Sequence, residues 1–145
     1  IAVCDENGAK LTALQPASAI VVRISARAKA NLDRPIFGFM FRNHLGQDFA
    51  GTNTARESTP LPPLIAGEVC TVDFHIELPL LYPSTFSFSP AIAEGTLEHY
   101  SICDWIDNAV ALEMEKAQDG PMYGQFHFPC RVEVNARAGV GAAAS

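Results

Sequence analysis

Three phenylalanines near the middle of the chain constrain its fold more than any other feature. Phe37, Phe39 and Phe41 occupy alternate positions of residues 36–42, which is the period of a β-strand that buries one face. Together the three rings would remove roughly 450–750 Å² from water. A surface of that size must be covered, so we expect further strands to pack against this one.

A turn follows this strand directly. Residues 43–47 (NHLGQ) are mostly polar, and Gly46 can adopt the positive φ that a tight turn needs. Residues 48–50 can then return as a second strand, which residues 51–53 (GTN) close. The stretch therefore predicts a hairpin with a loop of about four or five residues.

The same alternation recurs along most of the chain. It predicts further strands at residues 1–4, 18–28, 68–78, 85–89, 99–108, 109–116 and 125–134. Residues 109–116 could also form a two-turn helix on propensity, but we favour a strand. In residues 125–134 we expect the apolar side chains to face inward: Phe126, Phe128, Cys130, Val132 and Val134.

A proline-rich connection at residues 54–67 is expected to cross between two sheets, because a paired strand does not tolerate that density of proline. The prediction is an all-β fold of about eight strands, arranged as a two-sheet antiparallel β-sandwich.

Composition and length limit the classes of partner and indicate how many domains the chain forms. The chain has 145 residues and a formal net charge of −6, which argues against nucleic acid or an anionic membrane, because both need a basic patch. No apolar run approaches the ~20 residues of a membrane span.

We expect one domain at residues 1–136 and a flexible tail at residues 137–145. Because the chain opens on Ile1, without a methionine or a signal peptide, we expect a fragment of a longer protein.

The sequence lacks the motifs of catalysis and cofactor binding. It holds no Gly-rich phosphate loop and no GxSxG nucleophile elbow. His75 and His127 could meet Asp73 in a metal site, but we favour solvated strand faces. Asp104 and Asp107 are three residues apart and would lie on opposite faces of a strand, which disfavours a glycosidase pair. We therefore expect no enzyme activity, no metal and no cofactor in this domain.

The four cysteines are far apart in the sequence and form no metal-binding CxxC motif. Because nothing else in the sequence suggests secretion, we expect them to be reduced and buried as small apolar residues.

Residues 99–108 (HYSICDWIDN) combine aromatic and polar side chains. Sugar rings stack their apolar C–H faces on aromatic rings, while carboxylates, amides and cations bind their hydroxyls. Trp105, the only tryptophan, could provide the stacking surface with Tyr100. Two alternatives stay open: these aromatic residues could belong to the core, and Arg42, on the face of its strand opposite the phenylalanines, could be a solvated edge charge.

Three separated motifs resemble the C-terminal domain of Wzt, the ATP-binding subunit of ABC transporters that export O-antigen polysaccharide. In chain order they are residues 41–48 (FRNHLGQD) with residues 51–54 (GTNT), residues 64–68 (LIAGE) and residues 104–109 (DWIDNA). The resemblance covers most of residues 1–135.

The resemblance implies a jelly-roll or immunoglobulin-like sandwich that acts as a non-catalytic carbohydrate-binding module. It implies recognition of the completed, often modified, end of an O-antigen polysaccharide before export. It also implies a homodimer, and leaves open whether a terminal strand is exchanged. A membrane transporter subunit would be reached through an ATPase domain absent from this chain, at the cytoplasmic face of the inner membrane.

We predict a carbohydrate site from the polar and aromatic groups opposite the core-facing rows. Its residues are Tyr100, Trp105, Asp107, Arg42, His127 and Arg131. Two other functions are weighed against it. One is a β-sandwich that only pairs protein subunits, and the other is a small hydrolase, which the lack of paired catalytic groups disfavours.

Overall fold

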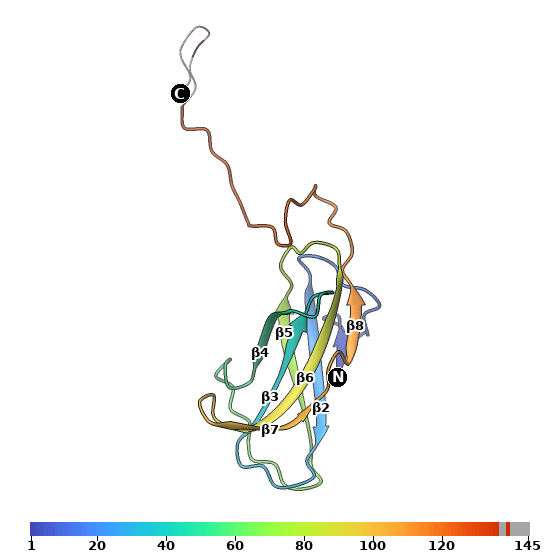
Figure 1. Cartoon of the computed structure of the whole chain (residues 1–145), viewed down its shortest axis with the longest axis vertical. Coiled ribbons are helices and arrows are strands. Elements are labelled where there is room, and N and C mark those ends of the chain that lie inside the picture. Colours follow the sequence, from blue (N-terminus) through green and yellow to red (C-terminus); the bar gives the residue numbers. More distant parts are fainter. Residues whose placement is uncertain (137–138, 140–145) are drawn as a thin grey trace.

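The structure is a computed structural model that describes residues 1–136 and 139. Two layers of strands face each other, and the end of the described chain leads away from them (Figure 1). The described residues form no helix, and hence none with the length and apolar character needed to cross a membrane.

Eight strands of the described chain form two antiparallel sheets, which confirms the predicted all-β sandwich. The first sheet has the order β1-β2-β5, with bounds Ala2–Cys4, Ala19–Arg27 and Val69–Glu77. The second has the order β4-β3-β6-β7, with bounds Asp48–Asn53, Pro35–Arg42, Thr85–Gly95 and Tyr100–Trp105. Strand β8, Val110–Glu113, also pairs with β6, so the strand favoured over a helix in this region is confirmed.

The predicted hairpin is present as β3 and β4. Its turn is held by Asn43, whose side-chain oxygen accepts hydrogen bonds from the backbone N–H groups of Leu45 and Gln47. Gly46 has a φ of 75°, the left-handed conformation that glycine adopts without strain. A register shift between Phe41 and Arg42 ends the regular pairing and is a site where a bulge can redirect a side chain.

The phenylalanines of β3 form the centre of the core. Phe39 meets Phe74 of β5 edge-to-face at 5.4 Å between ring centroids, which joins the two sheets. Phe41 stacks on Phe86 of β6 at 4.7 Å. Aromatic pairs of this kind add stability beyond the area they bury, so the Phe39–Phe74 contact helps to fix how the two sheets face each other, and the Phe41–Phe86 contact strengthens the second sheet.

Strands β7 and β8 lie one after the other along the same edge of β6. The register pairs Ala91 with Trp105 and Phe88 with Val110. Residues 106–109 bridge the two strands, and Asn108 adopts a positive φ of 51° there. Its backbone N–H donates to the hydroxyl of Ser89, which is fully buried. This connection holds Trp105 and Asp107 in place at the sheet edge.

The predicted final strand at residues 125–134 is wrong. This segment makes one isolated bridge, between Leu81 and Phe126, and then leaves the sandwich (Figure 1). The side chains expected to face inward are exposed: Phe126, Phe128, Cys130, Val132 and Val134. An alternating pattern shows a tendency to form a strand but does not supply the partner that its backbone needs, and Pro129 cannot donate to a ladder.

The cysteines are free, and only part of the prediction about them holds. Cys4 is buried and Cys70 is half-buried, whereas Cys103 and Cys130 are exposed. Cys103 is exposed because β7 is an edge strand whose side chains are exposed on both faces, and Cys130 lies in the segment that leaves the sandwich.

Candidate functional site

Arg42, Trp105 and Asp107, three residues of the predicted site, come together on the second sheet, where Arg42 of β3 reaches the connection between β7 and β8. The Arg42 guanidinium donates from Nε to Asp48 at 2.7 Å and from Nη1 to Asp107 at 2.8 Å. The indole Nε1 of Trp105 donates to the same Asp107 oxygen at 2.6 Å. The guanidinium carbon lies 5.8 Å from the Trp105 ring centroid, within the range of a cation–π contact.

The interpretation of Trp105 and Tyr100 as core residues is wrong. Trp105 is 40% exposed and Tyr100 is more exposed still. Arg42 is not a solvated edge charge either, because its side chain is only 18% exposed and is paired with two carboxylates. The cluster thus holds an accessible indole in a fixed orientation.

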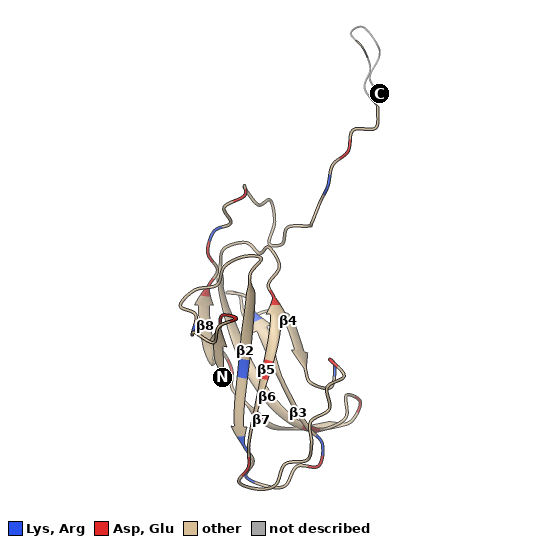
Figure 2. Ribbon diagram, turned by 180° about the vertical axis from the view of Figure 1, so that it is seen from behind, with Lys and Arg blue, Asp and Glu red and all other residues tan. Residues whose placement is uncertain are grey.

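The electrostatics of the cluster favour ionised Asp107. The hydrogen bond from Trp105, followed by the one from Arg42, lowers the pKa of this carboxyl below its usual value. The same carboxylate, after Asp48, raises the pKa of Arg42. Charged side chains are otherwise sparse on the strands (Figure 2), so this cluster is a local concentration of charge.

The depressed pKa of Asp107 predicts an acid transition in Trp105. Because its pKa in the folded state is lowered, Asp107 stays ionised and keeps its hydrogen bonds even at the usual carboxyl pKa of about 3.9. The bonds are lost only when the pH falls through the lower pKa of the folded state. We expect Trp105 fluorescence to change at a pH below the usual carboxyl pKa. Asp107→Asn should remove the change and Asp104→Asn should keep it. A transition that is unaltered in Asp107→Asn would contradict this assignment.

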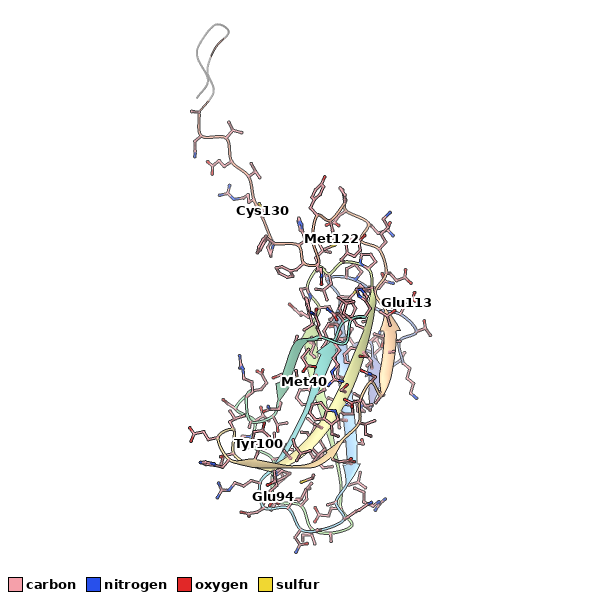
Figure 3. All side chains as sticks on the ribbon, viewed as in Figure 1. Met40, Glu94, Tyr100, Glu113, Met122 and Cys130 are labelled. Carbon is pink, nitrogen blue, oxygen red and sulfur yellow. The ribbon has the colours of Figure 1, made fainter. Side chains whose placement is uncertain are left out.

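A groove of about 340 Å³ lies beside Trp105 on the outer face of the second sheet. Its floor is made of small residues, Gly38, Ala91 and Ala93, and its sides carry larger ones. Those are Ile36, Met40, Thr52, Asn53, Leu97, Tyr100, Ile102 and Trp105, and Phe39, whose ring points into the core, also lines the groove. Figure 3 shows Met40 and Tyr100, which belong to β3 and β7. The sequence prediction included Tyr100 and Trp105 but missed the floor.

The missed residues left a weak signal in the sequence. Gly38 and Met40 alternate with the core phenylalanines, so they had to face outward, but the pattern does not reveal which strands lie beside them. A Cβ atom on Gly38 would approach the Cβ atom of Asn53 to 2.6 Å, so glycine is needed there for β4 to lie close.

His127 and Arg131 do not join the cluster. The backbone N–H of His127 donates to Leu80, in the connection between β5 and β6, and Arg131 pairs with Glu133 within the segment that leaves the sandwich. The predicted site depended on residues 125–134 forming a strand of the sandwich, and that strand is absent from the described fold.

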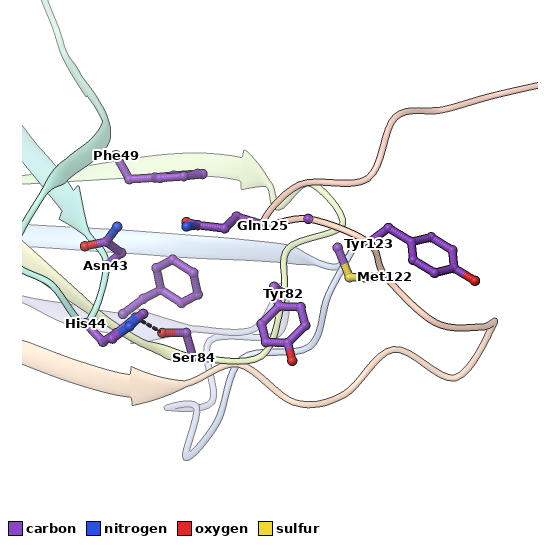
Figure 4. Close-up of a pocket in the computed structure, with 10 residues that line it drawn as sticks. Asn43, His44, Phe49, Tyr82, Ser84, Met122, Tyr123 and Gln125 are labelled. Atoms are coloured by element: carbon purple, nitrogen blue, oxygen red, sulfur yellow. Dashed lines mark hydrogen bonds between the residues drawn. The ribbon is translucent and has the colours of Figure 1, made fainter.

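A second hollow of about 420 Å³ lies near the turn of the β3–β4 hairpin (Figure 4). Its residues are Asn43, His44, Phe49, Tyr82, Ser84, Phe86, Met122, Tyr123, Gly124 and Gln125. Ser84 Oγ and His44 Nδ1 are hydrogen-bonded at 2.6 Å. Among the described residues no carboxylate bonds to His44, so the pair lacks the third group that orients a catalytic base.

The metal site considered from the sequence does not assemble. Asp73 instead forms a two-bond ion pair with Arg23. Within residues 1–136 and 139 no three histidine, cysteine, aspartate or glutamate side chains gather in a group that could hold a metal ion.

A family model described as the Wzt C-terminal domain matches residues 1–128. Among solved structures 12 chains match, and one is a crystal structure of the C-terminal domain of Wzt. It aligns with a TM-score of 0.81 at 15% sequence identity, over 92% of this chain and 80% of that one, a likeness that shows the fold. No curated protein matches the chain in sequence.

Proposed function

The chain belongs to the Wzt C-terminal domain family, and from this premise we propose that it is a non-catalytic module that binds O-antigen polysaccharide for export by an ABC transporter. The polysaccharide end would be the part recognised. A nucleotide-binding domain on the same protein would supply the ATPase activity and would place the module at the cytoplasmic face of the inner membrane.

The observation that carries the proposal is the exposed, fixed indole of Trp105. An exposed aromatic ring offers a flat apolar surface to the C–H face of a sugar. The hydrogen bond to Asp107 and the nearby guanidinium of Arg42 hold the ring, so little conformational freedom would be lost on binding. Asp107 and Asn53 lie close enough to the ring and the groove to bind hydroxyl groups.

We expect the affinity for a single sugar residue to be low. The groove is open, and each hydrogen bond to a hydroxyl contributes only about 0.5–1.5 kcal/mol net, because water already satisfies that hydroxyl. Useful affinity would then come from several sugar residues or from two sites in a dimer.

Replacement of Trp105 is the direct test. The domain is titrated with the O-polysaccharide of its own host, with the same chain lacking its terminal modification, and with an unrelated polysaccharide. We expect binding to the modified host chain only. Trp105→Ala should weaken it about tenfold, because a half-buried aromatic contact contributes about half of the 1.5–3 kcal/mol of full burial.

Tyr123→Ala provides the control, since it removes an exposed aromatic side chain outside the groove. Circular dichroism should show both variants folded. A folded parent domain that binds none of the polysaccharides would favour the alternative function, a module that only pairs protein subunits.

That alternative has one specific observation in its favour. Phe126, Phe128, Val132 and Val134 are between 43% and 84% exposed, and large apolar side chains exposed together on one segment are typical of an interaction site. Pairing of subunits and binding of glycan are compatible, so we propose that the module is a homodimer that binds glycan.

An apolar gap suggests how the dimer forms. It measures about 170 Å³. Residues of β4 line it together with Phe39, Phe41, Leu78 and Leu81. Residues 125–127 already contact Leu80 and Leu81. We propose that residues 126–134 of each copy add a strand to the other copy beside this gap and direct apolar side chains into it. This pairing would give the backbone hydrogen-bond partners and would cover the apolar side chains.

A further inference from the structure

Aromatic and polar side chains are also exposed together at the hollow near the turn of the β3–β4 hairpin. Phe49 is 39% exposed and Tyr82 is 52% exposed, and both line this hollow of about 420 Å³. The side chain of Gln125 extends toward Asn43, whereas the ring of Tyr123, with its hydroxyl, points away from these side chains (Figure 4). The hollow therefore offers two aromatic rings and one amide to a ligand.

The polar groups of the hollow differ in what they already bind. The side chain of Asn43 is committed to the hairpin turn, and Nδ1 of His44 is bonded to the hydroxyl of Ser84. The side-chain amide of Gln125 and the hydroxyl of Tyr82 make no hydrogen bond within the described part of the chain. Among the described residues no carboxylate, lysine or arginine lines the hollow. The groups that remain open therefore suit an uncharged ligand rich in hydroxyls.

The hollow and the groove lie apart along β6. Trp105 is paired with Ala91 in that strand, whereas Ser84, in the hollow, directly precedes the strand. Ala91 and Ser84 are seven residues apart, which is roughly 23 Å at the rise of a β-strand. Only a ligand of several linked sugar residues could reach from the groove to the hollow.

The charged cluster around Arg42 lies between the two sites. Arg42 is opposite Ser87 in the pairing of β3 with β6, part of the way from the groove to the hollow. Its partners Asp48 and Asp107 are exposed, and Arg42 uses only one oxygen of each. The other oxygen can accept a hydrogen bond from a hydroxyl. A glycan that passes from the groove to the hollow would therefore meet acceptors on its way.

We propose that the hollow is a second subsite for the same polysaccharide, and that it binds internal sugar residues while the end of the chain lies in the groove beside Trp105. The rings of Phe49 and Tyr82 would contact the C–H faces of a sugar, and the amide of Gln125 would bind its hydroxyls. The inference rests on the proposed glycan-binding function and adds which part of the polysaccharide is bound. Because one ligand joins both subsites, binding at the second becomes intramolecular and raises the overall affinity.

Fragments of the host O-polysaccharide that share the same modified end but differ in length test the inference. Each fragment is titrated into the isotope-labelled domain and followed by NMR. We expect the affinity to rise at least about tenfold once a fragment spans both subsites. The side-chain amide resonances of Gln125 should shift only with these longer fragments, whereas the indole resonance of Trp105 should shift with fragments of every length.

Tyr82→Ala separates the hollow from the groove. It should weaken binding of the long fragments about tenfold, as expected for a half-buried aromatic contact, and the short fragments should bind as tightly as they bind the parent. Gln125→Ala should act in the same direction and provides a second test if Tyr82→Ala does not fold. Trp105→Ala should weaken binding at every length. Tyr123→Ala is the matched control, because it removes the same ring from a side chain directed away from the hollow, and it should preserve the gain with length.

Three results would overturn the inference. They are an affinity that does not rise with length, a gain that survives both Tyr82→Ala and Gln125→Ala, and an equal loss for short and long fragments in Tyr82→Ala. If the short modified fragment binds and longer fragments bind no better, the inference fails and the proposed function stands. If no fragment of any length binds, both fail.

Discussion

Replacement of Phe88 by alanine is expected to lower the free energy of unfolding by about 3–5 kcal/mol. Phe88 of β6 is 1% exposed, and its ring lies 5.1 Å from that of Phe41 and 6.0 Å from that of Phe39. The substitution removes the ring and leaves a cavity that two sheets joined by aromatic contacts cannot easily close. Since domains are stable by only about 5–15 kcal/mol, much of the total would be lost.

Urea unfolding at one fixed protein concentration measures the change, because the stability of a dimer depends on concentration. Phe49→Ala is the matched control. Phe49 is 39% exposed at the edge of the sandwich and has ring contacts with Phe41 and Phe86. We expect Phe49→Ala to lower the free energy of unfolding by less than Phe88→Ala does. Equal losses at Phe49 and Phe88 would show that the aromatic core is not the main source of stability.

The sandwich could be predicted because its strands are marked by local alternation. The row of Phe37, Phe39 and Phe41 specifies a buried face without any knowledge of its neighbours, and residues 43–47 specify the turn. Both features depend on residues close together in the sequence. The same holds for Asp107 and Trp105, which are two positions apart and share one hydrogen bond.

The remainder of the site depends on which strands lie side by side, and alternation does not encode that. The groove floor combines Gly38 of β3 with Ala91 and Ala93 of β6, so no single stretch of sequence reveals it. Arg42 reaches Asp107 across 65 positions of sequence. The sequence prediction placed His127 in the site wrongly, because it assumed that residues 125–134 pair with a strand of the sheet.

The same segment provides the prediction with the largest effect on assembly. We expect the purified domain to be a dimer by analytical ultracentrifugation, and a variant with Phe126→Ser and Phe128→Ser to be a monomer. In an exchanged dimer each copy would bury two phenylalanines in the other, so four rings would leave water. At about 1.5–3 kcal/mol for each ring, the dimer would lose about 6 kcal/mol or more, a weakening of roughly 10⁴-fold.

Tyr123→Ser distinguishes exchange from a general effect of exposed aromatic residues. Tyr123 is 95% exposed and precedes the alternating segment, so its loss should leave the dimer intact. A parent domain that is monomeric at every concentration would contradict the exchange, as would a double variant that dimerises as strongly as the parent. If the dimer is lost but one copy still binds glycan at its groove with unchanged affinity per site, the second copy would serve avidity alone.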